Sequence, residues 1–194
     1  MADKIATRAA YGDAIVELAA AHPELVVLDA DLSSATMTKK FSQTYPARFL
    51  NMGIAEANMM GVAAGLATCG KKPFASTFAM FAAGRALRAG PQFHRLSPSE
   101  CKGGWGLTEE LSVGEDGATH QCCEDFATMR SIPGMVVCCP CDANEMRQAV
   151  RPWWSMTVPP TCVLAGPPWR MSPPPCPATP SSWARARCFG TAAT

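Results

Sequence analysis

The chain has 194 residues and a formal net charge of +1, with 17 Lys and Arg residues against 16 Asp and Glu residues. This balance, without any basic stripe, disfavours nucleic acid as a partner, and no run of about 18 apolar residues provides a membrane span. The beginning of the chain carries acidic residues and no long apolar stretch, so we expect no secretory leader, no membrane partner and a cytoplasmic location.

Helical and strand patterns alternate along the first part of the chain. The expected elements are a helix over 7–21, a strand over 25–31, a strand near 48–52, a helix over 53–70 and a strand over 72–77 that runs into an Ala-rich helix. Thr7 is the expected N-cap of the first helix, and Gly70 is expected to close the helix that precedes it.

Two stretches, residues 87–111 and 151–194, differ in composition from the rest of the chain. Together they hold all five tryptophans, and 151–194 lacks Asp, Glu, Lys, Asn, Gln and Ile. One interpretation of the second stretch is a Pro-rich, disordered tail. The other is that both stretches are translated in a displaced reading frame.

Back-translation favours the displaced frame. Codons can be chosen for Leu87–Lys102 that, read one base later, give YEQVRNSIAYPQANV, an ordinary helix-loop-strand sequence. Codons for Arg151–Val163, read one base earlier, give KAMVEYDGPTYVR. We therefore interpret 87–111 and 151–194 as out of frame, the second as a disordered tail that replaces a further domain. We therefore assign no functional role to the histidine, the cysteines and the tryptophans of these two stretches.

The part of the chain between these stretches resumes the alternation. We expect a helix over 120–134 that stops at a Pro-Gly pair, a strand over 135–139, and a helix over 142–150 with an Asp or Asn cap. Strands that alternate with helices, several of them apolar throughout, predict an α/β fold. This fold is a parallel sheet covered by helices on both faces, and we expect it to form one domain over residues 1–150.

The chain contains ten cysteines, which would suggest disulfides in a secreted protein. Cys138 and Cys141 form a CxxC motif, a spacing used in redox and zinc sites. No second CxxC and no nearby histidine pair accompanies it. We therefore interpret these residues as buried, reduced thiols and predict no metal site.

Polar segments follow the predicted strands: DADLSSAT from Asp29, NMGIAEANMM from Asn51, STFAMF from Ser76 and GEDGATHQ from Gly114. Ligand sites in parallel sheets lie beyond the carboxyl ends of the strands, so these segments are the candidate site. Each segment also has a purely structural interpretation. An acid is favoured at a helix N-terminus, a Phe pair packs in cores, and Asp-rich or Gly-rich loops form turns.

In this order, GIAE, STFxMF and GEDGxTHQ resemble the pyrimidine-binding domain of thiamine-diphosphate enzymes, specifically the C-terminal subunit of transketolase. The resemblance covers about residues 5–86 and 112–150. It implies an enzyme of the pentose phosphate pathway that transfers a two-carbon ketol unit from a ketose phosphate to an aldose phosphate. Two alternatives remain open. One is another thiamine-diphosphate enzyme (deoxyxylulose-phosphate synthase or the E1 beta subunit of a 2-oxo acid dehydrogenase), and the other is an inactive, frameshifted fragment.

The resemblance also implies roles for individual residues. It implies a cofactor site of Glu56, Phe78, Phe81 and Asp31, and a substrate site of Asp116 and His120. Glu56 would hydrogen-bond the aminopyrimidine nitrogen N1′ and favour the imino tautomer, which makes it the central catalytic residue, with His120 as the second. Phe81 would stack on the pyrimidine, Phe78 would wall its pocket, and Asp31 would lie beside the cofactor cleft.

A partner chain follows from what the sequence lacks. The family holds the diphosphate of thiamine diphosphate and its Mg²⁺ with a GDG run and a later Asn, and no GDG occurs here. The resemblance therefore implies that an N-terminal transketolase subunit binds the Mg²⁺ and the diphosphate. The active site would lie between chains of a homo- or hetero-oligomer, with sugar phosphates as substrates.

Overall fold

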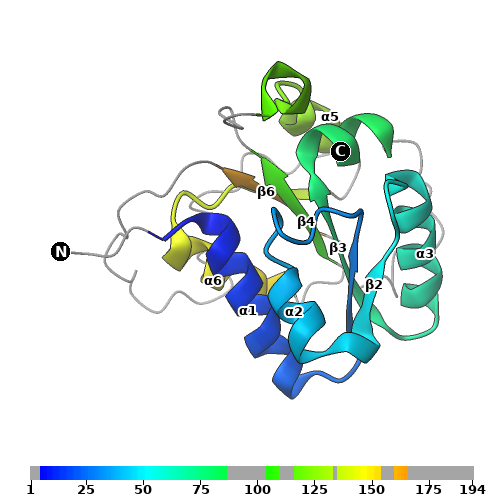
Figure 1. The fold of residues 1–194 in the computed structure, drawn as a ribbon. Helices are drawn as coiled ribbons and strands as arrows, with labels where there is room; N and C mark the ends of the chain where they lie inside the picture. Colours follow the sequence, from blue (N-terminus) through cyan, green and yellow to red (C-terminus); the bar gives the residue numbers. More distant parts are fainter. Residues whose placement is uncertain (1–4, 87–103, 110–115, 133–134, 154–159, 166–194) are drawn as a thin grey trace.

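The computed structural model describes residues 5–86, 104–109, 116–132, 135–153 and 160–165, and Figure 1 draws their arrangement. All strand pairs are parallel, in one sheet with the order β2-β1-β3-β4-β6-β5. The strands are β1 (Leu25–Asp29), β2 (Phe49–Asn51), β3 (Lys72–Phe78), β4 (Gly104–Glu109), β5 (Val136–Cys138) and β6 (Pro160–Ala165). The predicted parallel α/β fold is confirmed.

Helices cover both faces of this sheet (Figure 1). One face carries α1 (Thr7–Ala21), α2 (Lys39–Thr44) and α6 (Ala143–Trp153). The other carries α3 (Glu56–Thr68), the π-helix η2 (Met80–Arg85) and α5 (Asp125–Arg130). Short 3₁₀ turns, η1 (Pro46–Arg48) and η4 (Ala118–His120), complete the described elements. Among these residues, no helix combines the length and apolarity that crossing a bilayer would require.

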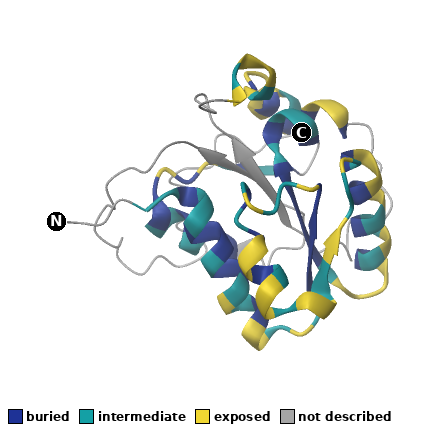
Figure 2. Ribbon diagram, viewed as in Figure 1, coloured by how far each residue is buried: buried dark blue, intermediate teal, exposed yellow. Residues whose placement is uncertain are grey.

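Each face of the sheet packs its own apolar cluster, and the neighbouring strands β1 and β3 are buried along most of their length (Figure 2). On the α1 side the largest buried side chains are Tyr11, Phe41 and Phe74. On the α3 side the cluster is mostly alanine and methionine. Small side chains let α3 and η2 pack closely against the sheet.

Several predicted helix boundaries are confirmed, and others are wrong. Gly70 follows α3 with φ +78°, as a helix-closing glycine does, and the Asp142 carboxylate accepts the Glu145 N–H at 2.8 Å as a cap. Thr7, however, is a buried first helical residue, and Ala6 occupies the cap position without a side-chain bond. Within the described part of the helix predicted over 120–134, only α5 is an α-helix, and the segment before it, with Cys122 buried, is not helical. The predicted Pro-Gly stop at 133–134 lies outside the described residues.

The two stretches interpreted as out of frame contain β4 and β6. The tail expected to be disordered thus contributes residues 160–165 to the sheet, which extends beyond residue 150, where we expected the domain to end. A parallel ladder is made by backbone N–H and C=O groups, so residues of unusual composition can form it. Pro160 is the first residue of β6, a position where a strand tolerates proline. The second stretch also contains 151–153, the end of α6, and the remaining residues of both stretches lie outside the described residues.

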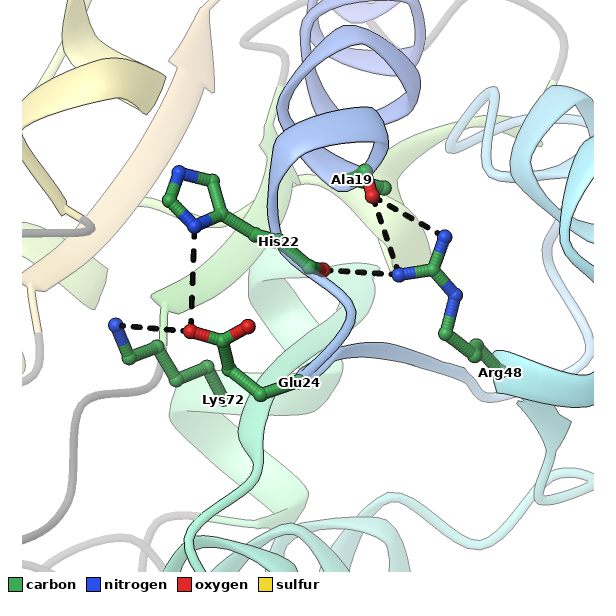
Figure 3. A network of polar contacts seen from close by, with 5 residues as sticks. All are labelled: Ala19, His22, Glu24, Arg48 and Lys72. Carbon is green, nitrogen blue, oxygen red and sulfur yellow. Dashed lines mark hydrogen bonds and ion pairs between the residues drawn. The ribbon is translucent and has the colours of Figure 1, made fainter.

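At the amino ends of the strands, an arginine closes α1 (Figure 3). Arg48 Nη1 donates to the carbonyls of Ala19 at 3.2 Å and His22 at 2.9 Å, and Nη2 donates to Ala19 at 3.2 Å. The guanidinium carbon also lies 4.1 Å from the Tyr45 ring centroid. The arginine therefore adds hydrogen bonds to two carbonyls at the end of α1 that also accept the backbone N–H groups of His22 and Leu25.

The same edge carries a small ion-pair cluster at the starts of β1 and β3 (Figure 3). Glu24 Oε1 lies 3.8 Å from Lys72 Nζ and 3.9 Å from His22 Nδ1. The Lys72 N–H also donates to the Glu24 carbonyl at 3.0 Å. These contacts fix the register of the two strands where they begin.

Candidate functional site

Glu56 lies at the opposite, carboxyl edge of the sheet, as the first residue of α3. Its side chain is only 1% exposed. The turn between β2 and α3 positions it: Gly53 has φ +67°, its N–H donates to Asn51 Oδ1 at 3.0 Å, and the Ala55 N–H donates to the Gly53 carbonyl at 2.8 Å. A positive φ suits glycine, so this residue allows the sharp entry into α3.

Asp31 follows β1 at the same edge. It is exposed, has φ +64°, and its Oδ1 accepts a hydrogen bond from Asn51 Nδ2 at 2.9 Å. Non-glycine residues in this left-handed region are uncommon and concentrate at functional sites. The contact ties the loop after β1 to the turn that leads to Glu56.

Asp29, the last residue of β1, organises the loop that follows. It is fully buried, and its carboxylate accepts from the Leu32 N–H at 2.6 Å, Thr36 Oγ1 at 2.7 Å and Thr38 Oγ1 at 2.9 Å. Desolvation by burial raises the pKa of the Asp29 carboxyl above 3.8, with a smaller contribution from the Asp31 charge, while the three hydrogen bonds oppose the rise. The loop therefore closes over an acid that the fold makes harder to ionise.

Phe78, Phe81 and His120 form an aromatic group at this edge. The Phe78 and Phe81 rings are stacked at 26°, with centroids 6.0 Å apart. The His120 ring meets both rings edge-on, at 5.8 Å from Phe78 and 5.3 Å from Phe81. Residues far apart in the chain, at the end of β3, in η2 and in η4, thus present adjacent ring faces.

Arg85 joins this aromatic group to Glu56. Its Nη1 lies 3.2 Å from Glu56 Oε1 and 3.1 Å from Oε2, and its guanidinium carbon lies 4.9 Å from the Phe81 ring centroid. Arg85 was not among the residues named from the sequence. The available signal was its position four residues after Phe81, a spacing that places two side chains on one side of a helix.

The structure thus brings together four of the six residues named from the sequence. Glu56, Phe78, Phe81 and His120 are linked through rings and the Arg85 guanidinium. Asp31 is linked instead to the turn before Glu56. Asp116 is exposed, and no hydrogen bond or ion pair joins it to another described residue.

The CxxC cysteines lie elsewhere, around the end of β5. Cys138 is half-buried and Cys141 is exposed, so the expectation of buried thiols is wrong for Cys141. The Cys141 N–H donates to Glu145 Oε2 at 2.9 Å, because the residue lies in the exposed turn that enters α6. Within the described residues, no group of three or more His, Cys, Asp or Glu side chains is arranged to hold a metal ion.

The chemistry of this donor set fits a flat heteroaromatic ligand. A buried carboxyl group can share a proton with a ring nitrogen, and its low exposure strengthens that hydrogen bond. Stacked aromatic side chains offer faces to a planar ring. The two kinds of contact are adjacent, since one guanidinium reaches both Glu56 and Phe81.

A family model described as "Transketolase, pyrimidine binding domain" matches residues 3–165. Among curated proteins, the chain is 48% identical over 147 residues to a putative transketolase C-terminal section of Methanocaldococcus jannaschii, covering 74% of this chain and 45% of that protein. It is 38% identical over 154 residues to human transketolase, covering 76% of this chain and 23% of that protein. The chain thus spans less than half the length of these curated relatives.

Among solved structures, a chain described as "Split gene transketolase, inactive beta4 tetramer" superimposes with a TM-score of 0.76 at 44% identity. The match covers 92% of this chain and 57% of that one. A transketolase from Leishmania mexicana superimposes with a TM-score of 0.73 at 28% identity, covering 86% of this chain and 26% of that one.

Proposed function

Because this chain belongs to the family of transketolase pyrimidine-binding domains, we propose that it is the C-terminal subunit of a split transketolase. Its reaction is the transfer of a two-carbon ketol unit from a ketose phosphate to an aldose phosphate. The observation that carries the proposal is the carboxylate of Glu56, 1% exposed and joined through Arg85 to a stacked phenylalanine pair. The location is the cytoplasm and the pathway is the pentose phosphate pathway.

The cofactor is thiamine diphosphate, which when bound supplies an electron sink for breaking the bond next to a ketose carbonyl. Phe81 stacks on its pyrimidine ring, Phe78 walls the pocket, and Asp31 borders the cleft through its contact with Asn51. The edge-on contacts of His120 with both phenylalanines support a single pocket at this edge of the sheet.

Glu56 holds a proton in its hydrogen bond with the pyrimidine nitrogen, and this shared proton is its catalytic contribution. Burial excludes water that would compete for the same hydrogen bond. His120 and Asp116 bind the hydroxyl and carbonyl oxygens of the sugar donor. The exposure of Asp116 leaves its carboxylate accessible to such a substrate.

The partner is an N-terminal transketolase subunit, which binds the Mg²⁺ and the diphosphate. Ile54, two residues before Glu56, is 76% exposed, and Leu50 is 40% exposed. Both side chains lie in the segment that leads to Glu56, where a partner chain that completes the site would cover them. The similar split-gene chain is described as an inactive tetramer of beta subunits, which supports a subunit that assembles but needs its partner for activity.

Reconstitution tests the proposal. The purified chain is mixed with the N-terminal subunit, thiamine diphosphate and Mg²⁺, and ketol transfer from a ketose phosphate to an aldose phosphate is measured. We expect transfer with both subunits and none when either is omitted. Turnover of pyruvate or another 2-oxo acid in place of the ketose would instead favour deoxyxylulose-phosphate synthase or a dehydrogenase E1 beta subunit.

We also propose that residues 87–111 and 151–194 are products of a displaced reading frame. Resequencing the gene tests this directly, since an intact frame would yield the sequences given by back-translation. If the chain as it stands gives no ketol transfer while a frame-corrected chain does, this chain is an inactive fragment. Equal activity of the two chains would contradict the inactive-fragment alternative, while an unchanged gene sequence on resequencing would contradict the displaced frame.

A further inference from the structure

Arg85 is the last residue of the π-helix η2, and the winding of that helix sets its position. Backbone bonds in a π-helix span five residues rather than four, and here the Ala86 N–H donates to the Phe81 carbonyl at 3.0 Å. The guanidinium carbon of Arg85 lies 4.9 Å from the centroid of the Phe81 ring. The guanidinium is thereby held over an aromatic side chain of the candidate site.

The same guanidinium binds Glu56. A single nitrogen, Nη1, donates to both carboxylate oxygens, at 3.2 Å and 3.1 Å. The Glu56 side chain is 1% exposed, whereas that of Arg85 is 53% exposed. A buried carboxylate without a partner is costly, so the pair stabilises the ligand-free form of the site.

We propose that Arg85 occupies the place of the aminopyrimidine ring in the ligand-free site and so lowers the affinity of the site for that ring. This inference rests on the proposed function. A guanidinium is planar, donates hydrogen bonds in its plane and stacks on aromatic faces. Its contacts with Glu56 and Phe81 are those that the proposed pyrimidine site offers. The guanidinium and the pyrimidine cannot contact Glu56 and Phe81 at the same time, so Arg85 leaves Glu56 when the pyrimidine binds.

The exposure of Arg85 makes this exchange feasible. The half-exposed side chain can turn into water, where its charge stays solvated, without displacing a buried neighbour. The ligand then binds the fraction of molecules from which Arg85 has moved away. The apparent dissociation constant equals the intrinsic constant divided by that fraction, so removal of the guanidinium should tighten binding.

A titration of Arg85→Met tests this. Methionine keeps an unbranched apolar stem and removes the donors and the charge. One probe is 4-amino-5-hydroxymethyl-2-methylpyrimidine, titrated by calorimetry into the full chain. The other is thiamine diphosphate with Mg²⁺, titrated into the chain assembled with the N-terminal subunit. We expect both dissociation constants to fall about fivefold or more relative to the wild type.

Arg147→Met is the matched control. Arg147 Nη2 pairs with Asp13 Oδ2 at 3.4 Å in the layer on the other side of the sheet, and its removal changes the net charge equally. It should leave both constants unchanged. Equal or weaker binding by Arg85→Met overturns the Arg85 inference alone. Absence of pyrimidine binding by every variant, assembled or not, overturns the proposed function as well.

Arg85→Ala gives a second measurement that does not depend on the first. It vacates the place of the guanidinium, which free guanidinium ion at millimolar concentration can then take. Guanidinium chloride should weaken pyrimidine binding to this variant more than equimolar sodium chloride does, and should have no such specific effect on the wild type. Equal effects of the two salts on Arg85→Ala would contradict this role of Arg85.

Discussion

The amino and carboxyl ends of the strands form two edges of the sheet, and these edges carry similar polar groups with different roles. At the amino edge, Arg48 and the Glu24–Lys72 pair close a helix end and two strand starts while staying partly exposed. At the carboxyl edge, Glu56 and Asp29 are acids withdrawn from water. Burying an ionisable group costs stability, and groups kept buried despite that cost concentrate at functional sites. The amino edge stabilises the fold, and the carboxyl edge prepares a site.

The largest expected difference between the two edges is a loss of catalytic rate in Glu56→Gln, at the carboxyl edge. The amide has the size of the carboxyl group but cannot share a proton with a ring nitrogen in the same way. We expect the ketol-transfer rate of the assembled enzyme to fall by about 10²–10⁴-fold. The circular dichroism spectrum and melting temperature should change little. Near-normal turnover would show that Glu56 is not the central catalytic residue.

Arg48→Ala is the corresponding change at the amino edge. It removes three hydrogen bonds to the carbonyls that end α1 and the contact with the Tyr45 ring. We expect the free energy of unfolding, measured by urea titration, to fall by about 2 kcal/mol, with cofactor affinity unchanged.

Arg48→Lys is its control. It keeps the charge, but an ammonium group cannot reproduce the planar fork that holds both carbonyls. Its stability should therefore lie between those of the wild type and Arg48→Ala. An unchanged unfolding free energy in Arg48→Ala would show that the amino edge does not depend on this cap.

Asp29 predicts a pH dependence at the carboxyl edge. Its pKa is raised in the folded chain above 3.8, so between 3.8 and the raised value the folded state binds more protons than the unfolded state. The free energy of unfolding should therefore fall as the pH rises through that interval, by about 1.4 kcal/mol for each unit of the rise in pKa.

Asp29→Asn should abolish this part of the dependence. The measurement is the difference in unfolding free energy between the wild type and Asp29→Asn at several pH values from 3.8 upward. The wild type should lose stability relative to the variant as the pH rises, and a difference that grows in the opposite direction would contradict the raised pKa.

The smallest effect is a matched pair of glycine substitutions. Gly53 precedes α3 with φ +67° and Gly70 follows it with φ +78°, and a Cβ at either position would meet no atom within 4 Å. Gly53→Ala and Gly70→Ala should each cost about 1 kcal/mol of stability through backbone strain. Only Gly53→Ala, in the turn that positions Glu56, should also lower activity. An equal loss of activity in both would remove the distinction between the edges.

Much of the fold was predictable because it depends on local patterns. Helical periodicity over 7–21 corresponds to α1, and the helix over 53–70 contains α3 together with its closing Gly70. Elements set by tertiary packing were less predictable. The 120–134 pattern is periodic enough for a longer helix than α5, and the composition of 104–109 and 160–165 gave no strand signal, yet both segments pair in the sheet.

The candidate site was predictable to the extent that motifs mark strand ends. Phe78 and Phe81 lie together because both are at the end of a predicted strand, β3. His120 joins them because it follows β4, a strand that the composition of 104–109 did not signal. The pairing of Glu56 with Arg85 joins residues 29 positions apart and depends on how α3 and η2 pack. The hydrogen bonds to Asp29 were not predictable from the sequence either, because they form only where the loop brings Thr36 and Thr38 back to the end of β1.

The π-helix η2 makes the chain length of this segment a determinant of the site. A π-turn accommodates more residues per turn than an α-turn, so deleting one residue from Ala82–Gly84 would let the segment rewind as an α-helix. Each residue of an α-helix advances by about 100°, so the arginine, then three residues after Phe81, would stay on the same side of the helix but lie about 60° around the axis from Phe81. Deletion of a single codon, with no change of amino-acid type at the site, would therefore change how this arginine lies relative to Phe81 and Glu56.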